Sequence, residues 1–89
     1  MISEEDKSMI VELATRYGVK RILLFGSAAD PNRPSHDIDL GVEGIAPDQF
    51  FRFYGDLIFG LSKPVDVIDL SVNNHFVSMV RRNGICIYG

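Results

Sequence analysis

Three stretches of the chain carry apolar residues at the three-to-four-residue spacing of amphipathic helices. They cover residues 4–17, residues 47–61 and a stretch that ends at residue 82. Ser3 precedes the first stretch and Asn73 or Asn74 precedes the last. These side chains are good N-caps because their oxygens accept hydrogen bonds from the first free backbone N–H groups of a helix. Gly18 and Gly84 stand where the first and last stretches end, a position that glycine commonly takes. The spacing therefore predicts three helices.

Four shorter apolar runs predict β-strands between and after these helices. They cover residues 21–25, 37–42, 65–70 and 85–88. The first run is apolar at nearly every position, which is typical of a strand buried on both faces. Helices and strands then follow in the order αββαβαβ. This order predicts an α/β (α+β) fold, with a small mixed β-sheet of about four strands and helices packed against it.

The length and composition fit one small globular domain that spans residues 1–89. Hydrophobic residues make up 46% of the chain and charged residues 24%, which is an ordinary globular balance. The single cysteine, Cys86, excludes an intrachain disulfide framework, and its position between two isoleucines predicts a small buried core residue. No apolar run approaches the ~20 residues of a membrane span, and the acidic N-terminus lacks a signal-peptide pattern. We therefore expect a cytoplasmic protein with no membrane contact.

The charge distribution argues against a nucleic-acid-binding surface. Nine Lys and Arg residues stand against twelve Asp and Glu residues, for a net charge of −3. The basic residues occur as scattered pairs at 20–21 and 81–82 rather than as a stripe. Because nucleic-acid binding depends on a concentrated basic patch, we expect no direct nucleic-acid partner.

Acidic residues occupy an unusual place in the second predicted strand. Asp37 and Asp39 alternate with the apolar Ile38 and would share one face of the strand. Two like charges so close repel each other, and strands disfavour Asp. A divalent cation would offset this cost, and Mg²⁺ prefers carboxylate and phosphate oxygens. Asp66, in the third predicted strand, could complete a site of three carboxylates for two metal ions.

A glycine–serine pair follows the first predicted strand and suggests a phosphate-binding turn. Gly26 lets the backbone approach a ligand closely. Backbone N–H groups and the Ser27 hydroxyl would then contact phosphate oxygens at the start of a helical turn. If Ser27 has only a structural role, it is a helix N-cap. If the two acids of the second strand likewise have no functional role, they are solvent-facing residues of an edge strand.

These motifs together resemble a known enzyme family. Phe25-Gly26-Ser27, nine further residues and then Asp37-Ile38-Asp39-Leu40, with Val65-Asp66-Val67 downstream, resemble the signature of the DNA polymerase β-like nucleotidyltransferase superfamily. More narrowly, the chain is similar to the minimal nucleotidyltransferases (MNT), small prokaryotic proteins encoded beside HEPN-domain partners. The resemblance covers nearly the whole chain and implies the nucleotidyltransferase fold.

The resemblance also implies a role for each motif residue. Gly26 and Ser27 would hold the triphosphate of ATP or another nucleoside triphosphate. Asp37 and Asp39 would bind both Mg²⁺ ions, with Mn²⁺ as a substitute, and Asp66 would bind the catalytic metal and help to activate the acceptor hydroxyl. The reaction would transfer AMP, or another nucleoside monophosphate, to a tyrosine of a HEPN toxin and release pyrophosphate. The chain would then act as the antitoxin of a HEPN/MNT pair.

The sequence departs from the minimal family after the glycine–serine pair. Minimal members commonly continue with Arg-Ala-Arg-Gly, whereas this chain reads Ala28-Ala29-Asp30-Pro31. Arginine near a polyphosphate would neutralise charge in the transition state, and Arg33 is a candidate substitute. A second hypothesis therefore stays open, in which the chain is a weakly active or inactive binding module that neutralises its partner by occlusion. A third, an antibiotic-inactivating enzyme, requires a further domain.

Other polar residues have simpler interpretations. Asp69 is the rival third acid, but it precedes Ser71 and fits a turn that ends the strand. His36 has the opposite strand parity to the acid pair, and His75 falls in the first turn of the last helix, so neither is expected to be a ligand.

The second predicted helix carries more aromatic residues than a small core can bury. They are Phe50, Phe51, Phe53, Tyr54 and Phe59, and they spread over more than one helix face. An exposed apolar face of this kind is typical of a protein contact. The sequence therefore suggests a partner surface here, in a homodimer or a hetero-oligomer, and leaves open the oligomeric state, the nucleotide and the acceptor.

Overall fold

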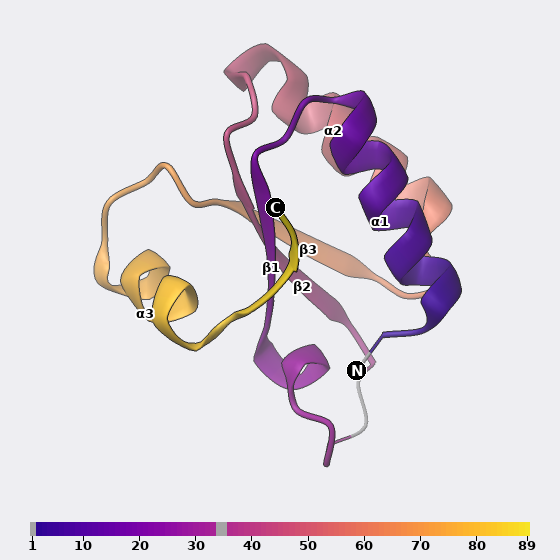
Figure 1. Ribbon diagram of the computed structural model, residues 1–89, viewed down its shortest axis with the longest axis vertical. Helices are drawn as coiled ribbons and strands as arrows, with labels where there is room; N and C mark the ends of the chain where they lie inside the picture. Colours follow the sequence, from indigo (N-terminus) through magenta and orange to yellow (C-terminus); the bar gives the residue numbers. More distant parts are fainter. Residues whose placement is uncertain (1, 34–35) are drawn as a thin grey trace.

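The computed structural model describes residues 2–33 and 36–89, and Figure 1 shows a twisted sheet between helices. The elements in chain order are α1 (Glu4–Arg16), β1 (Arg21–Phe25), the short 3₁₀ helix η1 (Gly26–Ala29), β2 (Ile38–Glu43), α2 (Pro47–Gly60), β3 (Val65–Asp69), α3 (His75–Asn83) and β4 (Ile85–Tyr88). Every predicted helix and strand is present, with boundaries that differ by one or two residues. The helical turn after the first strand is present as well.

The sheet is mixed, and β2 and β3 lie side by side in it. Its strand order is β3-β2-β1-β4. β2 runs parallel to β3, whereas β1 is antiparallel to both β2 and β4. Asp39 of β2 lies opposite Phe25 of β1 on one side and opposite Asp66 of β3 on the other. The end of β1 and the starts of β2 and β3 therefore meet at one end of the sheet.

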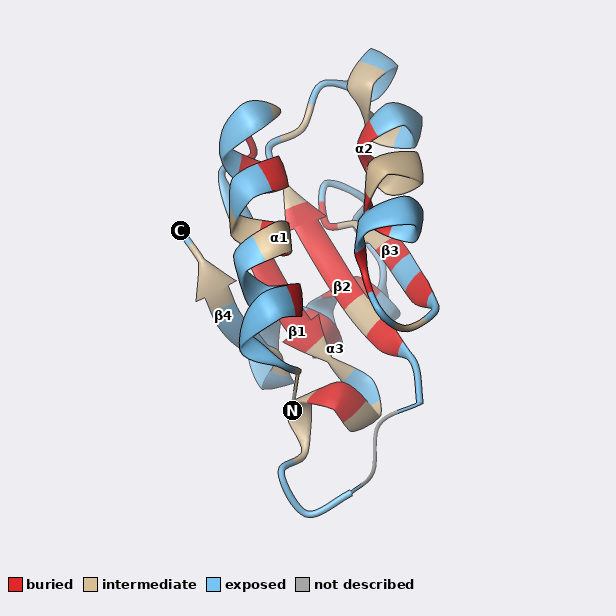
Figure 2. Ribbon diagram, turned by 90° about the vertical axis from the view of Figure 1, so that its right-hand side faces the viewer, coloured by how far each residue is buried: buried red, intermediate tan, exposed pale blue. Residues whose placement is uncertain are grey.

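The two faces of the sheet are covered unequally. α1 and α2 pack on one face, and Figure 2 shows the buried residues of β1 and β2 lying beneath them. This larger core includes Ile38, Leu40 and Val42, which are fully buried as the alternation predicts. α3 packs on the opposite face over a smaller core of Leu23, Leu70, Val77 and Val80. Asp39 and Asp66 alternate with core residues of the larger core, so they belong to the face that α3 only partly covers.

Side-chain caps fix the starts of two helices. The Asp6 backbone N–H donates to Ser3 Oγ (3.1 Å) at the start of α1. The Val77 backbone N–H donates to Asn74 Oδ1 (2.8 Å), so Asn74, rather than Asn73, caps α3. The buried Asp6 carboxylate also accepts from the Ser62 backbone N–H (3.0 Å) and from Ser62 Oγ (2.6 Å). This pair of hydrogen bonds joins the start of α1 to the loop between α2 and β3.

Cys86 corrects one prediction, because it is exposed rather than buried. It pairs with Leu23 across β1 and β4, but β4 is an edge strand with a neighbour on one side only. Its side chain therefore stays outside the cover of α3, and Cys86 Sγ lies 3.4 Å from Tyr88 O. Alternating apolar neighbours did not reveal this edge position. In the part of the chain that the structure describes, no helix has the length and apolar character of a membrane span.

Candidate functional site

The end of the sheet where β1 finishes brings together the residues that the sequence singled out. Gly26 and Ser27 open η1 directly after β1. Asp39 is the second residue of β2, and Asp66 is its register partner in β3. Asp39 is half-buried and Asp66 is exposed. Three segments that are distant in sequence therefore present a glycine–serine turn and two carboxylates at one place.

Asp37 lies just before β2 rather than within it, which corrects the predicted start of that strand. The Ile38 backbone N–H donates to Pro64 O (2.8 Å), and the pairing of β2 with β3 begins there. Proline has no backbone N–H with which to extend the ladder further. Asp37 is exposed, beside the first residue of the strand.

Gly26 and Asp39 are in close contact. Gly26 has a φ of +69°, which places it in the left-handed region that favours glycine. A Cβ at this position would overlap Asp39 Oδ2 and would lie 3.3 Å from Asp39 Cγ. Glycine is therefore needed here for two reasons, the backbone conformation and the space that the Asp39 carboxylate occupies.

The surroundings of Asp39 disfavour its negative charge. Partial burial raises the pKa of the Asp39 carboxyl above its usual value, and the nearby charges of Asp66 and Asp37 raise that pKa further. Asp66 and Asp37 are thus both close enough to Asp39 to repel its negative charge. A hard divalent cation would relieve this repulsion, and carboxylate oxygens are the ligands that Mg²⁺ prefers.

The carboxylate oxygens are suitable ligands for a metal ion, although the carboxylates are not arranged as a complete metal site. Among residues 2–33 and 36–89, no three His, Cys, Asp or Glu side chains are grouped tightly enough to hold an ion as they stand. Asp39 and Asp66 already lie at paired positions of adjacent strands. Asp37 lies outside the strand ladder, one residue before β2.

Tyr54 is a residue near the site that sequence reasoning placed only among the aromatics of the second helix. Its hydroxyl donates to Val65 O (3.3 Å), and it also lies 3.5 Å from Asp66 Oδ1. It reaches β3 from α2, because β3 is the edge strand on that side of the sheet. The apolar spacing of α2 gives no signal for this contact, which depends on how the helix lies against the strand.

The remaining polar residues of the region form hydrogen bonds within loops or are exposed. The Ser71 backbone N–H donates to Asp69 Oδ1 (2.9 Å), so Asp69 forms the turn that ends β3, as expected. Asp30, which stands where minimal family members carry an arginine, accepts from the Asn32 backbone N–H through Oδ1 (2.9 Å). Arg33 lies in the same exposed loop. His36 and His75 are exposed.

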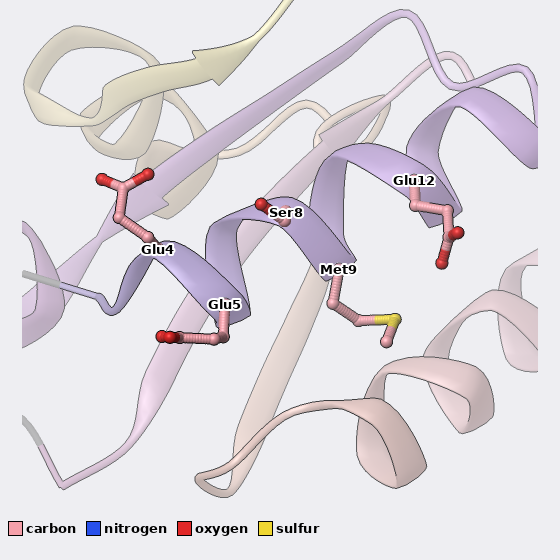
Figure 3. A pocket seen from close by; sticks show the side chains of 5 residues that line it. All are labelled: Glu4, Glu5, Ser8, Met9 and Glu12. Carbon is pink, nitrogen blue, oxygen red and sulfur yellow. The ribbon is translucent and has the colours of Figure 1, made fainter.

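A separate hollow of about 530 Å³ lies on the outer surface of α1 (Figure 3). It is lined by Glu4, Glu5, Ser8, Met9 and Glu12. Figure 3 shows that the three glutamates of this single helix point in different directions. They do not converge on a ligand, and none of the candidate site residues contributes to this hollow.

Comparisons with known proteins agree with the fold. The family model described as Polymerase beta, Nucleotidyltransferase matches residues 8–89. No curated protein is significantly similar to the chain in sequence. Among solved structures, a toxin–antitoxin with AMP-PNP superposes with a TM-score of 0.75 at 21% identity, covering 93% of this chain and 73% of that one. The toxin–antitoxin MntA-HepT gives a TM-score of 0.72 at 19% identity, covering 98% and 73%.

A further solved structure is a candidate minimal nucleotidyltransferase. It superposes with a TM-score of 0.70 at 25% identity, covering 89% of this chain and 86% of that one. The nucleotidyltransferase fold that the sequence predicts is thereby confirmed. With a family match over nearly its whole length, the chain belongs to the polymerase β nucleotidyltransferase family.

Proposed function

We propose that the chain is a Mg²⁺-dependent nucleotidyltransferase that transfers AMP from ATP to a tyrosine hydroxyl of a HEPN-domain toxin, and so acts as its antitoxin in the cytoplasm. The observation that carries this proposal is the contact of Gly26 with Asp39, which lies opposite Asp66 at the same end of the sheet. A phosphate-binding turn and paired carboxylates are the two parts that such a reaction needs.

Each residue of the site has a role in this proposal. Asp37, Asp39 and Asp66 would hold two Mg²⁺ ions, or Mn²⁺ in their place, which when bound supply charge for the attacking and leaving oxygens. Gly26 and Ser27 would hold the triphosphate through backbone N–H groups and the serine hydroxyl. Asp66, the most exposed of the strand acids, would draw the proton from the tyrosine hydroxyl. The hydroxyl oxygen then bonds to the α-phosphorus, and pyrophosphate leaves.

A macromolecular acceptor fits the surface of the chain. One face of α2 presents Phe51, Ile58 and Phe59, which are 82%, 59% and 94% exposed. Phe51 and Ile58 are seven residues, or about two turns, apart and so lie on the same side of the helix, with Phe59 further round it; these three exposed side chains are called the apolar strip below. Apolar side chains this exposed are typical of protein interfaces. The fold is also that of solved toxin–antitoxin structures, MntA-HepT among them, and a toxin is therefore the partner we propose for this strip.

Occlusion without catalysis is the second candidate function, and one observation favours it. Where minimal members carry arginines, this chain has Ala28 and Asp30, and Asp30 shapes the loop through its hydrogen bond to the Asn32 backbone. The turn therefore lacks the cations that would stabilise a polyphosphate transition state. In this case the chain would silence its partner by covering it.

A single substitution separates the two functions. Asp66→Asn keeps the side chain's size and removes its charge, so the enzyme hypothesis expects partner binding without transfer and without rescue of growth. Asp69→Asn is the matched control, since Asn retains the acceptor that Asp69 offers to the Ser71 backbone. Transfer is measured by mass spectrometry of the HEPN partner after incubation with the chain, ATP and Mg²⁺, beside a pull-down. Full growth rescue by an Asp66→Asn protein that transfers no nucleotide would leave only the occlusion hypothesis.

A further inference from the structure

A second, apolar pocket adjoins the candidate site. It has a volume of about 340 Å³ and lies between the end of β1, η1 and α3. Its lining includes Phe25, Gly26, Phe76, Met79, Val80 and Asn83. This volume is at the lower end of the range for small-molecule sites, which are mostly apolar with a few polar groups. The pocket therefore has room for one compact ring system.

Two aromatic side chains, Phe25 and Phe76, line this pocket. The rings of Phe25 and Phe76 meet edge to face, with centroids 5.8 Å apart and planes at 78°. Phe76 is nevertheless 46% exposed and Met79 is 47% exposed. Their packing within the chain thus leaves apolar surface uncovered on the pocket side of α3. A flat aromatic ligand would cover it by stacking, which every nucleobase can do.

The pocket and the acidic site share a boundary. Gly26 lines the pocket and is also the residue whose missing side chain leaves space for the Asp39 carboxylate. Phe25 lies opposite Asp39 in the β1–β2 register. The apolar pocket and the carboxylates are therefore adjacent on the same face of the sheet. In a nucleotide, one ribose separates the base from the phosphates, so both sites are within reach of one molecule.

Asn83 supplies the polar group that can select among bases. It is the last residue of α3 and lines the pocket. Its amide offers one donor group and one acceptor, a pair that matches the N6 and N7 edge of adenine. Guanine presents two acceptors, O6 and N7, on the same edge and leaves the amide oxygen without a donor.

We propose that this pocket binds the adenine base of the nucleoside triphosphate, with stacking on Phe76 and pairing to the Asn83 amide. The proposal rests on the proposed function, because it assumes that the phosphates lie at Gly26 and Ser27. It adds the place where the base binds and the residue that would select adenine, which the proposed function leaves open.

Binding measurements on the intact chain test this proposal with three probes, each in Mg²⁺: ATP, GTP and inorganic tripolyphosphate. Wild type should bind ATP about tenfold more tightly than GTP, which is within the range for one bidentate base contact. Phe76→Ala should weaken ATP binding about tenfold, as expected for a lost stacking ring, and should leave tripolyphosphate binding unchanged. Asn83→Ala should remove the preference for ATP over GTP.

Control variants separate the pocket from general effects on folding. Val72→Ala shortens an exposed apolar side chain that does not line the pocket, and it should bind all three probes as wild type does. Phe76→Tyr keeps a ring at the same position and should restore ATP binding. Thermal unfolding of each variant shows whether it is folded at the assay temperature.

The outcomes distinguish this inference from the function on which it rests. If wild type binds tripolyphosphate in a manner that needs Asp39, but ATP binds no more tightly and Phe76→Ala changes nothing, the base pocket is wrong and the phosphate site stands. If neither tripolyphosphate nor ATP binds to wild type, both proposals are overturned. An ATP preference that Phe76→Ala and Asn83→Ala each remove supports the pocket.

Discussion

Replacing Gly26 with alanine should separate the stability of the chain from its capacity to bind a nucleotide. Gly18 provides a matched control, because both glycines have a φ of +69°. A Cβ at Gly18 would meet nothing within 4 Å, whereas a Cβ at Gly26 would overlap Asp39 Oδ2. The two alanine variants therefore share the backbone strain and differ in the contact with the carboxylate.

The expected magnitudes follow from these two contributions. A residue with a Cβ in the left-handed region costs about 1–2 kcal/mol, so both variants should lose roughly that much free energy of unfolding. Each kcal/mol corresponds to roughly 4–8 °C in the thermal midpoint of a domain of this size. Gly26→Ala must also turn the Asp39 side chain away from its position, and an off-rotamer side chain costs about 0.5–1.5 kcal/mol. The difference in stability between the variants should therefore be small.

The difference in ligand binding should be large. A ligand at one hundred times its Kd stabilises the folded chain by about 2.7 kcal/mol. Thermal unfolding with and without Mg²⁺ and ATP should show this stabilisation for wild type and for Gly18→Ala, and little of it for Gly26→Ala, whose Asp39 is displaced. Equal ligand-induced shifts in the two alanine variants would refute the idea that the Gly26–Asp39 contact builds the site.

Three further outcomes follow from the structure. Burial and neighbouring carboxylates raise the pKa of Asp39, so the folded state holds the proton of this carboxyl more tightly than the unfolded state does. The contribution of this proton to the free energy of unfolding should be full below about pH 4. It should be lost as pH rises through the raised pKa. Urea unfolding across pH without metal should show this loss in wild type and not in Asp39→Asn. The same pH dependence of the free energy of unfolding in both proteins would contradict the effect of Asp39. Millimolar Mg²⁺ or Mn²⁺ should raise the thermal midpoint of wild type but not of the Asp37→Asn/Asp39→Asn double variant, and an equal rise in both would contradict the metal assignment. Phe51→Ala, at a side chain that is 82% exposed, should change stability by less than about 0.5 kcal/mol but weaken partner binding or self-association by ~2 kcal/mol, and unchanged affinity in sedimentation and pull-down experiments would remove the interface.

The alternation of residues was enough to predict which faces of the strands are buried. Side chains of a strand point alternately to its two faces, so buried Ile38 and Leu40 fix Asp39 on the opposite face. The same reasoning places Asp66 between buried Val65 and Val67. Each of these inferences uses only neighbours in sequence, which explains why the sequence alone could supply them. That the two acids lie at paired positions depends on the β2–β3 register, which the periodicity does not give.

Features that depend on contacts between distant segments were not predictable in this way. The exposure of Cys86 follows from the edge position of β4. The pattern of apolar residues does not indicate the order of the strands in the sheet, so it could not predict this position. The approach of Tyr54 to Asp66 depends on how α2 lies against β3. The ring contact between Phe25 and Phe76 joins residues of β1 and α3 that no local periodicity relates.

The unequal cover of the two sheet faces explains how so short a chain combines a core with an open site. α1 and α2 close one face completely enough to bury Ile38, Leu40 and Val42 without solvent contact. On the other face Leu70 packs directly against Gly41, where an added Cβ would meet Leu70 Cδ2 at 2.8 Å. This close packing lets the segment leading into α3 cover the middle of β2 while the start of the strand, two residues earlier, stays open at Asp39. The chain needs only one helix on this face for its smaller core, and the part of the sheet that this helix leaves uncovered is where the carboxylates lie.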